Sequence, residues 1–183
     1  MTTRYKLTHA DNTTHGKTLW GEGIQHSVPG TGNLCGPGWI HVYPDPVLAV
    51  FLDPIHGNFG DAALLWHCDV SGRMKSDRGL KEGWQHVTTA YQVERVQPTN
   101  NQRIAFGIYC AQEVNDDVRW NRWAAAWLSG KDRTKSADEA AKAAWAAARA
   151  TAEAAAVDLP TLAARAMEFE ATTGVHDAGE EEA

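Results

Sequence analysis

The amino-acid composition of the chain changes abruptly near Pro98, and this change limits the folds that the sequence can adopt. Residues 1–97 are rich in Gly, Pro, His and strand-forming residues, whereas the following residues up to 173 are dominated by Ala, Trp and charged side chains. β-branched and aromatic residues favour strands, and Ala favours helices. The sequence therefore predicts an α+β fold, with a small mixed or antiparallel sheet and short helices followed by a helical C-terminal region.

Four segments of the first region combine strand-forming residues with partial alternation of apolar and polar positions. We expect strands within residues 5–9, 39–43, 63–70 and 86–96. A Gly- and Ser-containing stretch at residues 70–79 predicts a turn between the last two strands.

The segment CGPGWIHVYPDP, residues 35–46, predicts a corner between a strand and a short helix. Gly36, Pro37 and Gly38 favour a turn. Asp45 is suited to the N-cap and Pro46 to the first helical position, and Pro54 predicts that the helix ends before it.

The region after Pro98 predicts several helices. Residues 101–114 are apolar almost all round, which indicates a buried helix. Trp120, Trp123 and Trp127 fall on one face of a second helix, and we expect this stripe to belong to the core rather than to a binding surface.

A distinct alanine-rich helix is expected over residues 134–157, where 13 of 24 residues are Ala. Ala contributes little apolar area, so this segment is poorly suited to form a core but allows another backbone to approach closely. Trp145 lies on the charged side of the helix, near Lys142 and Arg149. These cations either shelter the indole ring or form with it a partner-binding site.

Asp158 and Pro160 predict the start of a last helix, and the acidic residues 174–183 predict a disordered tail. The expected organisation is therefore an α+β domain over residues 1–97, a helical region rich in Ala and Trp over residues 98–173, and the tail.

Composition also narrows the functional classes. The net charge of −6 makes nucleic acid an unlikely partner, because phosphate binding needs clustered Lys and Arg. Three cysteines without framework spacing predict reduced thiols. The sequence shows no secretion signal and no apolar run long enough to span a membrane, so we expect a cytoplasmic protein without membrane association.

Motifs for metal binding or catalysis are weak. Cys35, His41, His67 and Cys68 are suitable zinc ligands by type, but neighbouring strand residues point to opposite faces, and no metal is expected. No nucleophile elbow or phosphate-binding loop occurs in the sequence. No complete catalytic site can be assembled from these residues.

Residues 34–52, followed by residues 63–72, resemble a widespread family of small uncharacterised bacteriophage and prophage proteins, in which a Cys-Gly-x-Gly segment precedes a Pro-Asp-Pro helix start. Actinobacterial members look similar over further segments, including WGEG, LDPIHGNFG, QRIAFGIYCA and WLSGKDRT. The resemblance covers residues 3–157 and implies a phage protein in the cytoplasm of a bacterial host.

A second resemblance is to the ADP-ribosyltransferase fold, carried by the Gly-Trp-Ile-His-Val strand and the later strand ending in DVSG. It implies that His41 borders a nicotinamide pocket and that His15 and Gly16 hold a ribose. Such transferases also use a carboxylate on a later strand, for which this sequence offers only Glu94.

Three functions are therefore expected in order. The first is a phage or prophage accessory protein, without catalysis, that binds a host or phage protein or another copy of itself through Lys142, Trp145 and Arg149. The alternative is a domain that binds NAD or a related nucleotide at His15, His41 and Tyr43, with or without catalysis. The third is a structural virion protein.

Overall fold

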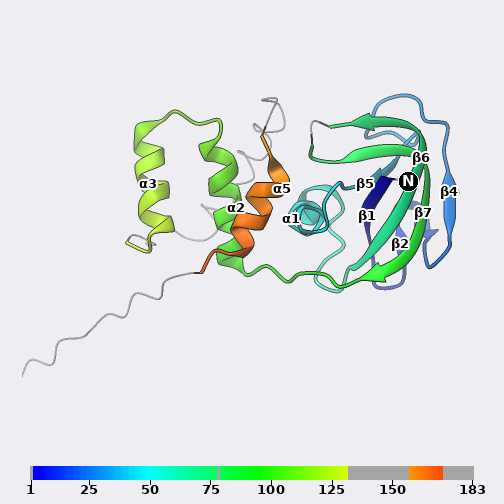
Figure 1. Ribbon diagram of the computed structural model, residues 1–183, viewed down its shortest axis with the longest axis horizontal. Helices are drawn as coiled ribbons and strands as arrows, with labels where there is room; N and C mark the ends of the chain where they lie inside the picture. The colour runs from blue at the N-terminus through cyan, green and yellow to red at the C-terminus, as the bar shows by residue number, and fades with distance from the viewer. Residues whose placement is uncertain (1, 78, 132–156, 171–183) are drawn as a thin grey trace, which may run out of the picture.

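The computed structural model describes residues 2–77, 79–131 and 157–170, and these residues form an α+β fold, as the sequence predicts (Figure 1). The main sheet is antiparallel and has the order β1-β6-β7-β4, with β5 pairing with β7. Its strands are β1 (Thr2–Thr8), β4 (Gln25–Ser27), β5 (Ile40–Val42), β6 (Leu64–Ser76) and β7 (Glu82–Val93).

The longest strands form the β6–β7 hairpin, and its turn differs from the prediction. Residues 70–76 belong to β6, so the predicted turn at 70–79 is wrong over most of its length. Register shifts next to His67 and after Ser71 keep the strands paired, and Gly72 adopts a φ of 82° within the second irregularity. A bulge of this kind lets turn-forming residues continue in a strand.

A small hairpin lies beside the sheet. It consists of β2 (Thr13–Thr14) and β3 (Thr18–Leu19), joined by the short 3-10 helix His15–Lys17. Gly16 and Lys17 have φ values of 69° and 58°, a left-handed conformation that Gly adopts at little cost. The tight connection holds the residues of this turn in one fixed position.

Helix α1 (Pro46–His56) begins as predicted, with the Asp45 side chain accepting a hydrogen bond from the Leu48 amide at 2.8 Å. Its predicted end before Pro54 is wrong, because the helix continues through this proline to His56. Pro54 has no amide hydrogen to donate to the Val50 carbonyl. Arg103 of a neighbouring helix instead donates to that carbonyl at 3.5 Å.

The remaining described helices are α2 (Asn100–Gln112), α3 (Val118–Leu128) and α5 (Leu159–Met167). Side-chain caps begin all three helices, from Thr99, Asp117 and Asp158. Trp127 is buried, and Trp120 and Trp123 pack partly buried against the main core, which confirms the predicted stripe.

The main hydrophobic core joins the sheet to the helices. It includes Leu7 and Leu65 of the sheet, Leu48 of α1, Ile108 of α2 and Leu162 of α5. Helix α1 lies between the sheet and α5, with α2 and α3 on its far side (Figure 1). The core therefore draws on residues before and after Pro98.

A second, smaller core lies on the opposite face of β1 and β6. Because strand residues alternate between faces, Lys6 and Trp66 point away from Leu7 and Leu65. This cluster contains Trp20, Ile40, Val42, Trp66, Cys68, Val70 and Val87. Lys6 is therefore a charged residue placed at an otherwise apolar face.

Several predictions fall outside the described residues. These are most of the alanine-rich helix, with Lys142, Trp145 and Arg149, and the acidic tail at 174–183. No helix among the residues that the structure describes is long and apolar enough to cross a membrane.

Candidate functional site

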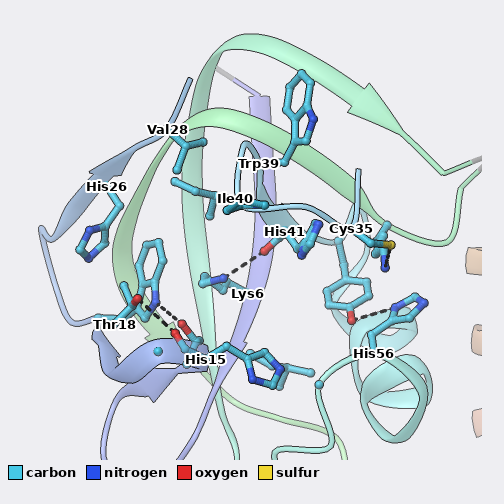
Figure 2. A pocket seen from close by; sticks show the side chains of 18 of the residues that line it. Lys6, His15, Thr18, His26, Val28, Cys35, Trp39, Ile40, His41 and His56 are labelled. Carbon is cyan, nitrogen blue, oxygen red and sulfur yellow. Dashed lines mark hydrogen bonds between the residues drawn. The ribbon is translucent and has the colours of Figure 1, made fainter. Parts of the chain in front are cut away.

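A pocket of about 800 Å³ opens between the sheet, the small hairpin and the end of α1 (Figure 2). Its walls come from segments far apart in the sequence, and they include the predicted residues His15, His41 and Tyr43. The structure thus brings the three residues of the alternative nucleotide site into one cavity. The same pocket is lined by basic residues that the sequence did not single out, namely Lys6, His26, His56 and Lys81.

His41 and Tyr43 are placed by the pairing of β5 and the residue after it. His41 lies on β5 opposite Gly83, and its Nε2 donates to the Leu34 carbonyl at 2.5 Å. Tyr43 forms an isolated bridge with Tyr5 through two backbone hydrogen bonds of 2.9 and 2.8 Å. The strand therefore fixes both side chains without help from a ligand.

Tyr43 and His56 form a polar pair at the base of the pocket (Figure 2). The Tyr43 hydroxyl lies 3.1 Å from Nδ1 of His56, and the two rings are stacked at 5.9 Å. His56 belongs to the last turn of α1, so the continuation of this helix through Pro54 brings the imidazole into the pocket.

His15 lies at the small hairpin and contacts the opposite wall through Phe59, whose ring centroid is 6.3 Å away. Phe59 is in turn held by its amide, which donates to the Asp53 carboxylate at 3.1 Å. A side chain at Gly57 would collide with the Phe59 ring, since a Cβ there would lie 2.2 Å from Cε2. The absence of a side chain at this position gives Phe59 its place in the wall.

Lys6 is the most unusual residue of the pocket. Its side chain extends from β1 into the apolar face, and the residue is only 7% exposed. Its amine donates to the His41 carbonyl at 3.1 Å and lies 4.5 Å from the centre of a Trp20 ring. Burial lowers the pKa of Lys6 to about 8, although the nearby Cys68 opposes this shift.

Lys81 and Cys35 meet at another part of the rim. The Lys81 amine donates to the Cys35 sulfur at 3.5 Å, and Lys81 is 8% exposed whereas Cys35 is exposed. Lys81 follows the turn of the β6–β7 hairpin, and Cys35 lies in the loop before β5. The long hairpin thus delivers a second lysine to the pocket.

The two central histidines are neutral at pH 7. Burial lowers the pKa of His56 to about 4, and the positive Lys81 adds to this effect. Burial also lowers the pKa of His41, while its hydrogen bond with the Leu34 carbonyl opposes the shift. Neutral imidazoles offer hydrogen bonds to a ligand, and the positive charge of the pocket comes from its lysines.

No acidic side chain is found among the described residues that line the pocket. Glu94, which the transferase resemblance required as a catalytic carboxylate, lies beyond the end of β7 and does not line the cavity. Glu82 is occupied elsewhere, in a two-bond ion pair with Arg4 at 2.6 and 2.9 Å.

The residues described here contain no group of three or more His, Cys, Asp or Glu side chains that could hold a metal ion. The pocket residues Lys6, Lys81 and His56 were missed because nothing local marks them. A lysine in an alternating strand normally indicates a solvent-facing position. Its burial here depends on Trp20 and Trp66, which are distant in sequence.

Comparisons with known proteins add no assignment: no family model, no curated protein and no solved structure matches the sequence. The resemblances to a phage family and to the ADP-ribosyltransferase fold therefore stay predictions. The partner-binding role of Lys142, Trp145 and Arg149 also stays a prediction.

Proposed function

We propose that this chain binds a small anionic molecule with a planar ring, of the nucleotide class, in the pocket around His41. The observation that carries the proposal is the lining of the cavity. It combines two lysines and four histidines with four aromatic side chains, and no described lining residue is acidic. The contrast is informative because the chain as a whole is acidic, with 23 Asp and Glu against 17 Lys and Arg.

The lining suits both halves of such a ligand. Lysine amines and imidazole hydrogens stabilise phosphate or carboxylate oxygens, more strongly where water is excluded. Trp20, Trp39, Tyr43 and Phe59 provide aromatic surface for a ring. A cavity of about 800 Å³ is within the usual range for small-molecule sites.

Binding, rather than ADP-ribosyl transfer, is the activity that we propose. NAD and ADP-ribose fit the chemistry of the lining, as the transferase resemblance implies. A transferase needs a carboxylate to polarise the ribose hydroxyl, and the described residues bring none to this cavity.

Thermal unfolding with and without ADP, ADP-ribose or NAD tests the proposal. A ligand at 100 times its Kd stabilises the folded state by about 2.7 kcal/mol, so at least one of the three is expected to raise the unfolding temperature. If none does so at millimolar concentration, the proposed function is wrong.

A pair of lysine variants locates the binding. Lys81→Met removes an amine from the pocket, whereas Lys75→Met removes an amine that donates to the Gly32 carbonyl outside it. The loss of a charged hydrogen bond predicts that Lys81→Met weakens binding by about tenfold or more. Lys75→Met is expected to bind as the wild type does, and equal weakening in both variants would place the ligand elsewhere.

A further inference from the structure

The environment of the Lys6 amine differs from that of an ordinary buried lysine. No carboxylate among the described residues forms an ion pair with it. Its one hydrogen-bond acceptor is the neutral carbonyl of His41, and its other close contact is the face of Trp20. Figure 2 shows the amine in the middle of the pocket, between His41 and the small hairpin that carries His15.

These contacts hold an ammonium only weakly. Removing an amine from water disfavours its charged form unless an opposite charge compensates, and here a carbonyl dipole and an indole ring take the place of a carboxylate. The consequence is a pKa lowered to about 8. About one-tenth of the Lys6 side chains are then uncharged at pH 7, against less than about a thousandth for an unperturbed lysine.

We propose that Lys6 is a nucleophilic lysine, which forms an imine with the aldehyde or ketone group of an anionic ligand bound in this pocket. The inference rests on the proposed function, because the pocket must first hold the ligand that carries the carbonyl. It adds a reactive group to that site and restricts the ligand to carbonyl compounds with a phosphate or carboxylate.

The step balances without an oxidant or a reductant. The lone pair of the uncharged Nζ attacks the carbonyl carbon to form a C–N bond, and the carbonyl oxygen takes up a proton to give a carbinolamine. Loss of that hydroxyl as water and of the remaining proton from Nζ forms the C=N bond. The net reaction is amine plus carbonyl compound to imine plus water, as at known lysines activated by desolvation.

Other lysines of the chain lack this combination of features. Lys81 also lines the pocket, but its amine is bound to the Cys35 sulfur. Lys75 is exposed and outside the cavity. Lys81 is therefore placed to hold the anionic group while Lys6 reacts with the carbonyl.

The test uses pyridoxal 5′-phosphate, an aromatic aldehyde with a phosphate group, as the probe on the full chain. The protein is mixed with an equimolar amount at pH 7.5, imines are reduced with borohydride, and the modified lysines are identified by peptide mass spectrometry. We expect at least about tenfold more adduct at Lys6 than at Lys75, because the free-amine fractions differ by more than that factor. Excess ADP is expected to protect Lys6 and not Lys75.

Lys6→Arg provides the matched variant, since it keeps a positive charge but cannot form a stable imine. It is expected to lose the main adduct and the visible imine absorbance. If this variant does not fold, the protection of Lys6 by ADP in the wild-type protein still tests the proposal. Adduct spread evenly over the exposed lysines, with Lys6 unmodified, would overturn it.

The two proposals fail in different ways. Stabilisation by a nucleotide without an adduct at Lys6 would contradict the nucleophilic lysine and leave the binding function intact. A dominant adduct at Lys6 without stabilisation by any nucleotide would support the lysine and contradict nucleotide binding.

Discussion

Individual side chains of the pocket owe their properties to contacts that are distant in sequence. His15, His41 and Tyr43 were predicted as one site from a family resemblance, and the structure places all three in one cavity. Lys6 and His56 were not predicted. The first is buried by a tryptophan from another segment, and the second enters the pocket because a helix continues past a proline.

The low pKa of His56 predicts acid sensitivity of the fold. Its folded value of about 4 lies below the ordinary value of 6.5, because of burial and then of Lys81 and His41. The unfolded state therefore binds more protons between these two pH values, and stability falls as the pH falls from 6.5 to 4. The loss amounts to about 3 kcal/mol at most.

Urea unfolding at pH 7.5 and at pH 4.5 measures this effect. His56→Gln keeps a polar side chain beside Tyr43 but cannot take up a proton in this pH range. The variant is expected to lose less stability on acidification than the wild type does. An identical loss in the two proteins would show that His56 stays accessible to protons in the folded state.

At the level of helices and strands, residues that satisfy backbone groups locally were the most predictable features. Asp45 and Asp158 were identified as the residues that begin helices, and both cap them in the structure. Gly130 was expected to end α3, and it adopts a φ of 77° directly after the Ser129 cap.

The errors in the elements involve non-local pairing. The Val50 carbonyl, which Pro54 leaves without a helical partner, accepts from Arg103 of another helix, and no pattern within residues 45–57 indicates this contact. Residues 70–76 contain turn-forming side chains, yet they pair with β7 across a bulge. A sequence window records the local preference and not the partner strand.

The cap of α1 has a measurable effect, because this helix carries His56. Asp45→Ala removes the acceptor for the Leu48 amide and is expected to lower the free energy of unfolding by about 1 kcal/mol. Asp45→Asn is the control, since its side-chain oxygen can accept the same hydrogen bond. Urea titration checks the difference, and equal stabilities of the Ala and Asn variants would mean that the cap contributes nothing.

For the molecule as a whole, the α+β prediction is confirmed, and the composition change at Pro98 separates the strands from the later helices. Composition did not reveal that α1, from the first region, packs between β1 and α5. The shared core predicts that sheet and helices unfold together rather than as independent units.

Ile108→Ala tests that coupling. Ile108 is 1% exposed in the main core, and its truncation is expected to cost about 3 kcal/mol. Circular dichroism of the helices and hydrogen exchange of the β6 and β7 amides are both expected to report this loss. Val118→Ala, at a 70% exposed position of α3, is the control, with a change within about 0.5 kcal/mol. Destabilised helices beside an unaffected sheet would contradict a common core.

Whether the pocket holds an anionic ligand is tested most directly by NMR titration of the labelled full chain with ADP-ribose. We expect the amide resonances of Lys6, His15, His41 and Tyr43 to move together and to saturate with one Kd, while the resonance of Lys75 stays in place. Unchanged pocket resonances at millimolar ADP-ribose, ADP and NAD would contradict the proposed site.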